Sequence, residues 1–218
     1  MRKHRSALLL AAVAALFAIP STVVAQRAPA PDDAPPSVAT PPPPGAKPRG
    51  REAPKPETRA EALTRLYGQL AAAPDAATSQ RIVQEIEVVW SQTASPTAML
   101  LLNRALVAAN EKNFDLSLQF LDTVTELYPD WSEGFNRRAY LYVVKLDYGR
   151  ALGDLRRVLA LDPGNFRALE GLVQVLRTMG QDKAALDVVR TLVKAHPFSP
   201  GAQETLKQLE EAVDGRGI

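Results

Sequence analysis

Three prolines divide the C-terminal part of the chain into equal lengths. Pro129, Pro163 and Pro197 are each 34 residues apart, and each follows an apolar stretch with helical spacing. Proline has no amide hydrogen for a helix and disfavours helical geometry at the residue before it, so each of the three should end a helix. A fixed period of this size is typical of stacked supersecondary units. The spacing therefore favours a linear array over a globular fold.

Cutting the chain after each Pro-x-x gives three blocks with the same internal order, 98–131, 132–165 and 166–199. Apolar residues recur at three- and four-residue spacing throughout, and strand signals are few. This periodicity indicates pairs of amphipathic helices. Small residues recur at the eighth place of the first two blocks and at the twentieth place of all three, with Val173 at the eighth place of the third block. A large side chain at these places would force two closely packed helices apart. The alanines at these places are Ala105, Ala139, Ala151 and Ala185.

The blocks resemble the tetratricopeptide repeat. That family has a bulky residue at the fourth place, small residues at the eighth and twentieth, an aromatic near the seventeenth and proline at the thirty-second. The middle block supplies Phe135, Ala139, Tyr148, Ala151 and Pro163. At the seventh place, where the family usually has leucine, the first two blocks have Arg104 and Arg138. The resemblance implies an all-α fold, a right-handed α-solenoid of antiparallel helix pairs, and the layout is similar to small exported repeat proteins of alphaproteobacteria.

Helices are also expected on both sides of the array. Residues 57–97 contain two amphipathic segments, which we interpret as a degenerate helix pair that caps the N-terminal end. After the array, Ser199-Pro200 is expected to supply the N-cap and first residue of a capping helix within 200–218. Caps are needed because a terminal repeat would otherwise leave its apolar side open.

The first 25 residues have the three parts of a secretory signal. A basic start precedes an apolar run of 13 residues, Ala7 to Ile19, and small residues follow up to Ala25. A helix needs about 20 residues to cross the hydrocarbon of a membrane, so the run is short for a permanent anchor. We expect cleavage after Ala25 and a periplasmic location in a Gram-negative bacterium, with membrane contact only through the signal peptide. An uncleaved anchor and a buried helix are the alternatives.

Residues 26–56 hold 11 of the 18 prolines and almost no large apolar side chain. Such a segment cannot bury enough surface to offset its ordering entropy, so we expect a disordered, semi-rigid spacer with polyproline II character. A docking strip for an aromatic-lined groove and a cell-wall spacer are the alternatives. The net charge of +2 arises from residues 1–56, because residues 57–218 have 18 basic and 21 acidic side chains. This charge step places a domain boundary near residue 57.

Composition and motifs argue against catalysis. The chain has no cysteine and two histidines, His4 and His196, so one copy cannot build a disulfide, a thiolate site or a multi-histidine metal site. No nucleophile elbow, phosphate-binding glycine loop or metalloprotease motif occurs. His196 is expected to face solvent at the end of a helix. The basic residues are scattered over a net acidic domain, which disfavours nucleic acid as a partner. We expect no enzyme activity, cofactor or metal.

A surface for a protein or peptide partner is the remaining candidate. The resemblance implies that the first helix of each repeat lines a concave face. Tyr140, flanked by arginines, is the strongest candidate there, because aromatic and guanidinium groups provide contact area and forked hydrogen bonds. An extended peptide with an acidic or C-terminal carboxylate would suit it. The candidates are Asn103, Asn110, Asn136, Arg137, Tyr140, Arg167, Gln174 and Arg177.

The expected function is that of an adaptor or scaffold in the bacterial envelope, with a ligand in the concave groove. The family's carboxylate clamp for chaperone tails is not expected, because Leu102, Leu106 and Gly171 occupy three of its places. The groove arginines could instead only keep the surface soluble or pair with Glu133 and Glu170. Two other classes stay open: a structural spacer whose repeats oligomerise, and an enzyme with an unrecognised site.

Overall fold

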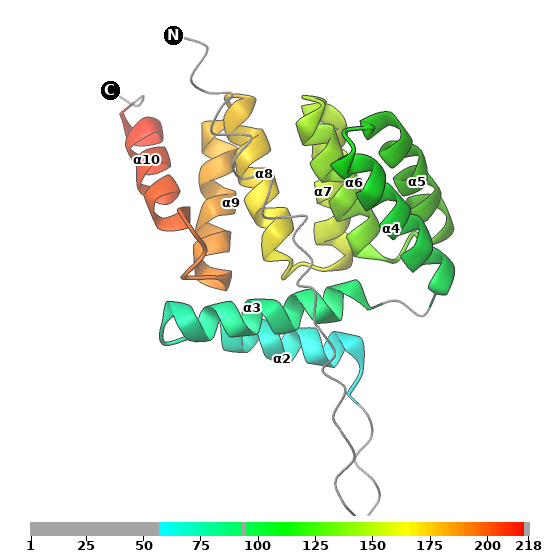
Figure 1. Cartoon of the computed structure of the whole chain (residues 1–218). Helices are drawn as coiled ribbons and strands as arrows, with labels where there is room; N and C mark the ends of the chain where they lie inside the picture. The colour runs from blue at the N-terminus through cyan, green and yellow to red at the C-terminus, as the bar shows by residue number, and fades with distance from the viewer. Residues whose placement is uncertain (1–56, 93–94, 216–218) are drawn as a thin grey trace, which may run out of the picture. The chain divides into compact units, whose positions relative to one another are not determined.

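The computed structural model describes residues 57–92 and 95–215, and the expected signal and spacer of residues 1–56 lie outside this part. The described part contains helices and no strand (Figure 1). None of these helices is long and apolar enough to span a membrane. The helices are α2 (Arg59–Ala71), α3 (Ala76–Ser91), α4 (Pro96–Asn110), α5 (Phe114–Leu127), α6 (Ser132–Val144), α7 (Tyr148–Leu161), α8 (Phe166–Thr178), α9 (Asp182–Ala195) and α10 (Ala202–Asp214).

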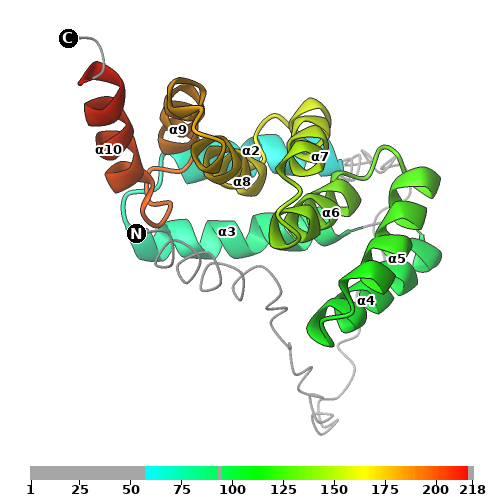
Figure 2. The same cartoon turned by 90° about the horizontal axis from the view of Figure 1, so that it is seen from above.

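Three antiparallel helix pairs form a row: α4 with α5, α6 with α7, and α8 with α9. Figure 2 shows the first helices α4, α6 and α8 on one side of this row and the second helices on the other. Each second helix ends two residues before one of the three repeat prolines. This is the all-α solenoid of helix pairs that the 34-residue period predicts.

Buried small residues let the two helices of each pair approach closely. Ala105 and Ala139 are 1% exposed, and Ala151 and Ala185 are fully buried. The last two repeats share one apolar core, and Leu209 of α10 belongs to it. The C-terminal helix therefore covers the apolar side that the third repeat would otherwise expose.

The start of α10 differs from the Ser199-Pro200 start that we expected. The helix begins at Ala202, after Gly201 with φ of 72°, a left-handed conformation that glycine adopts without strain. The Ser199 hydroxyl donates to Oε1 of Glu170 in α8 at 2.7 Å and does not cap the helix. The prediction was wrong because Ser199 belongs to a turn before the helix, in which its carbonyl oxygen accepts from the Ala202 amide at 3.1 Å.

The pair α2–α3 is present, but it does not stack on the first repeat as an N-terminal cap. Its packing contacts run from α3 to α6 and from α2 to α9, and Figure 1 shows both helices lying across one end of α6 to α9. Trp90 and Ile86 of α3 share a core with Phe166 of α8 and Leu192 of α9. The pair therefore holds the later repeats together, and no described helix stacks on the outer side of the first repeat.

Candidate functional site

The turns between repeats carry side chains that bond to the segment before the first repeat. Tyr128, Asp162 and His196 occupy the same place in the three repeats, immediately before the proline. The Tyr128 hydroxyl accepts from the Ser95 hydroxyl at 2.6 Å, and His196 Nε2 lies 3.0 Å from the Ser79 hydroxyl. Asp162 bonds to both α2 and α3. The residue before the repeat proline thus makes a polar contact with the preceding segment in all three repeats.

Asp162 is the centre of this interface. Its Oδ2 accepts from the Tyr67 hydroxyl at 2.6 Å and from the Trp90 indole Nε1 at 2.9 Å, and the side chain is 7% exposed. Burial, together with the charge of Asp162, raises the pKa of Tyr67 well above its ordinary value, so the phenol stays protonated and donates. Gly164 leaves room for this tyrosine, because a Cβ there would lie 2.4 Å from its ring.

His196 is buried and not solvent-facing as we expected. It is 5% exposed, and its ring meets Phe166 edge-on with centroids 5.0 Å apart. Burial and, to a smaller extent, the charge of Arg167 lower the pKa of His196 to about 4. The expectation was wrong because α3, through Ser79, covers this turn. The imidazole is therefore neutral at neutral pH.

Stability should fall as the pH drops from 6.5 to 4. Histidine in the unfolded chain titrates near pH 6.5, whereas His196 in the folded protein titrates near 4. Between these values the unfolded state binds a proton that the folded state does not, so the stabilisation present above pH 6.5 is lost towards pH 4, by about 3 kcal/mol at most. Urea unfolding of the wild type and His196→Gln at pH 7.5 and 4.5 measures this. A difference between the two proteins that stays the same at both pH values would contradict a buried neutral histidine.

The candidate groove residues lie on the first helices. Tyr140 of α6 is half-buried, and burial raises its pKa to about 12, so it is a neutral phenol at neutral pH. Gln174 is also partly exposed at the equivalent place of α8, whereas Asn136 is buried. Asn103 and Asn110 of α4 are exposed. Ligand binding by these side chains stays a prediction.

The three candidate arginines differ in their partners. Arg137 pairs with Glu133 one turn before it. Arg167 pairs with Glu170 at 3.3 Å and with Glu87 of α3 at 2.7 Å. Arg177 is exposed and donates to the Gln208 amide oxygen of α10 at 3.2 Å. Of the three, Arg177 is the one without a carboxylate partner among the described residues.

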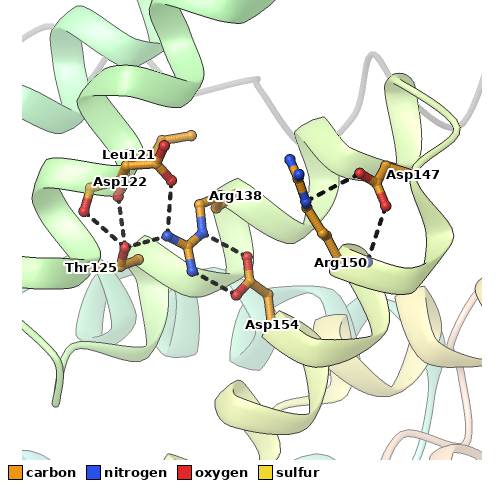
Figure 3. Close-up of polar contacts among 7 residues, drawn as sticks. All are labelled: Leu121, Asp122, Thr125, Arg138, Asp147, Arg150 and Asp154. Atoms are coloured by element: carbon orange, nitrogen blue, oxygen red, sulfur yellow. Dashed lines mark hydrogen bonds and ion pairs between the residues drawn. The ribbon is translucent and has the colours of Figure 1, made fainter.

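Arg138, at the place where the family usually has leucine, links three helices (Figure 3). Its guanidinium bonds to both carboxylate oxygens of Asp154 in α7 at 2.8 Å, and to Asp122 and the Thr125 hydroxyl of α5 at 2.9 and 2.6 Å. The bonds to Asp154, followed by those to Asp122, hold the pKa of this guanidinium above its ordinary value. These partners were not predicted from the sequence, although each aspartate is 16 residues from Arg138.

Within residues 57–92 and 95–215, no three histidine, aspartate or glutamate side chains gather in a way that could hold a metal ion. The polar clusters that do occur join helices to one another. The described geometry is that of an all-α solenoid with an exposed side formed by consecutive first helices.

Comparison with known proteins assigns this solenoid to a family. A sequence profile of the tetratricopeptide repeat matches residues 147–212. A "TPR repeat-containing protein" of Rhizobium etli is 33% identical over 153 residues, which are 70% of this chain and 75% of that protein. The chain belongs to the tetratricopeptide repeat family. Heat shock protein STI1 of Saccharomyces cerevisiae is 31% identical over 103 residues, 47% of this chain and 18% of that protein.

Solved structures share the fold. The tetratricopeptide domain of Sgt2 from Aspergillus fumigatus has a TM-score of 0.52 and 16% identity, and covers 58% of this chain and 85% of that one. The first such domain of Spaghetti, bound to the HSP90 peptide SRMEEVD, has a TM-score of 0.53 and 14% identity, and covers 57% of this chain and 98% of that one. Tetratricopeptide repeat domains are protein–protein interaction modules.

Proposed function

We propose that the protein is a non-enzymatic adaptor of the bacterial envelope, which binds an extended segment of another protein across α4, α6 and α8. One observation carries the proposal: Tyr140 and Gln174, at equivalent places of consecutive repeats, are both partly exposed on the side formed by the first helices. A ligand that runs along the row would meet this place in the second and third repeats. In the first repeat the equivalent Leu106 is buried, and the exposed Asn103 and Asn110 would meet the ligand instead.

The side chains favour a ligand with a carboxylate. Tyr140 offers a neutral phenol as a hydrogen-bond donor, and Arg177 offers a guanidinium without a carboxylate partner among the described residues. Arg137 and Arg167 are weaker candidates, because Glu133, Glu87 and Glu170 already accept from them. Asn103 and Asn110 supply amides that can bond to the backbone of an extended peptide.

The place of action is part of the proposal. The three-part pattern of residues 1–25 supports export, and the 11 prolines of residues 26–56 support an extended N-terminal spacer before the repeats. Any catalysis would belong to the proteins that the adaptor brings together.

The combined substitution Tyr140→Ala with Arg177→Glu should abolish capture of the partner, because it removes the aromatic contact and reverses the charge. The measurement is affinity capture with the full chain from envelope extracts, read by mass spectrometry. Both residues are partly or fully exposed, so helicity measured by circular dichroism should be unchanged.

Leu127→Ala with Arg156→Glu is the matched control, because it makes the same kinds of change at exposed places of the second helices α5 and α7. It should capture the same proteins as the wild type. If the wild type and the Tyr140 and Arg177 variant capture identical proteins, ligand binding along the first helices is excluded.

A further inference from the structure

The outer side of α4 is exposed, whereas the equivalent sides of α6 and α8 are buried. Val107 is 57% exposed, and the residues 34 and 68 places later, Leu141 and Val175, are 1% and 0% exposed. Leu100 is 54% exposed, and its equivalent Ala168 is fully buried. In the later repeats the second helix of the preceding repeat covers this side. The first repeat lacks such a cover because α2–α3 packs elsewhere.

Four residues define this surface, which we call the α4 stripe: Leu100, Arg104, Val107 and Glu111. Their spacing of four, three and four places them along one face of the helix. All four side chains are exposed. Among the described residues, neither Arg104 nor Glu111 has an ion-pair partner. The stripe therefore carries an apolar centre between a cation and a carboxylate that are seven residues apart.

The equivalent stripe on α6 shows how a helix covers this side. Arg138 pairs with Asp122 of α5 at 2.9 Å, and Lys145 pairs with Asp115 of α5 at 2.5 Å. From Arg138 to Lys145 the chain of α6 advances by seven residues, and from Asp122 to Asp115 their partners in α5 go back by seven residues. The covering helix is antiparallel, and it places an opposite charge against each end of the stripe.

The same geometry specifies what would cover α4. An antiparallel helix must place a carboxylate against Arg104 and, seven residues earlier in its own sequence, a cation against Glu111, with an apolar residue between them. The helix α4 itself has this pattern, because Arg104 precedes Glu111 by seven residues and Val107 lies between.

We propose that two copies of this chain associate through their α4 stripes in an antiparallel arrangement. Arg104 of each copy pairs with Glu111 of the other, and the two Val107 side chains pack near the two-fold axis. The interface is isologous, because the same stripe serves both subunits. Tyr140 and Gln174 of the proposed peptide-binding side lie on other helices and take no part in it, whereas Asn103 and Asn110 are next to Arg104 and Glu111 in the sequence.

Charge reversal in the full chain tests this dimer, with sedimentation velocity over a wide range of protein concentration. The wild type should show a monomer–dimer equilibrium. Arg104→Glu and Glu111→Arg should each raise the dissociation constant at least about tenfold, because each puts like charges opposite one another. Arg156→Glu, an exposed change of the same charge on α7, should leave the equilibrium unchanged.

Mixing the two single variants is the decisive measurement. A chain with Arg104→Glu and a chain with Glu111→Arg have complementary stripes, so the mixture should form a heterodimer at concentrations at which each variant alone is monomeric. The double variant should likewise dimerise with itself. A monomeric wild type at every concentration would overturn the proposal and would leave the stripe to a helix of another protein. A dimer that is indifferent to both single reversals would also overturn it.

Discussion

Replacing Asp162 with alanine is expected to lower the free energy of unfolding by about 3 kcal/mol. The Tyr67 hydroxyl and the Trp90 indole both donate to Oδ2 of this buried carboxylate. The substitution takes the acceptor from the Tyr67 hydroxyl, whereas the Trp90 indole keeps the Tyr67 oxygen as an acceptor at 2.8 Å. A buried donor left without an acceptor costs about 1–3 kcal/mol, and bonds to a charged acceptor are at the strong end of this range. Tyr67 and Trp90 lie on α2 and α3. The substitution should therefore increase the amide hydrogen-exchange rates of these two helices more than those of the other helices.

Asp130→Ala is the matched control, because it removes an aspartate from the turn of the preceding repeat where the side chain is 93% exposed. This change should alter stability by less than about 0.5 kcal/mol. Urea unfolding of the two variants and the wild type gives the comparison. If Asp162→Ala is as stable as the control, the hydrogen bonds of Asp162 do not hold α2 and α3 against the repeats.

Ala139→Trp is expected to destabilise the protein by about 3 kcal/mol or more. Ala139 lies where α6 and α7 pack against each other and is 1% exposed, in one apolar core with Ala151 and Leu155. The core has no free volume for an indole at this place. The two helices must therefore move apart, or the neighbouring side chains must adopt strained conformations. Thermal unfolding followed by circular dichroism measures the loss.

The exposed Ala184→Trp of α9 provides the comparison, because it adds the same side chain to a helix surface. Its melting temperature should stay close to that of the wild type. Equal melting temperatures for Ala139→Trp and the wild type would mean that the assumed place of Ala139 in the 34-residue repeat is wrong.

The repeats could be predicted from the sequence because their signals are local. Pro129, Pro163 and Pro197 end helices through their own backbone chemistry, and the alanines at the eighth and twentieth places mark close crossings within one helix pair. Both signals depend on residues at most a few turns apart. They are therefore readable without knowledge of the tertiary structure.

The placement of α2–α3 could not be predicted in this way. It depends on Tyr67 reaching Asp162 and on Ser79 reaching His196, pairs that are 95 and 117 residues apart. The same amphipathic pattern is compatible with a helix pair that stacks on the first repeat and with one that packs across the turns between the repeats. A histidine before a proline likewise has the same sequence signature whether or not another helix covers it.

The sequence contains a weak signal from which the ionic partners of Arg138 could have been predicted. An arginine in place of the family's leucine needs a carboxylate if it is to be partly buried, and Asp122 and Asp154 lie on the flanking helices at the same distance in sequence. The proposed groove residues had no such signal in the sequence, because the partner proposed for them is another molecule.

Site-specific photocrosslinking in living cells tests the central claim most directly, which is that the side formed by the first helices binds another protein. A photoreactive phenylalanine derivative in place of Tyr140 should yield a discrete covalent adduct with one envelope protein. The same group in place of Leu127, which is 57% exposed on α5, should not yield that adduct. The absence of any adduct from position 140, or the same adduct from both positions, would contradict the claim.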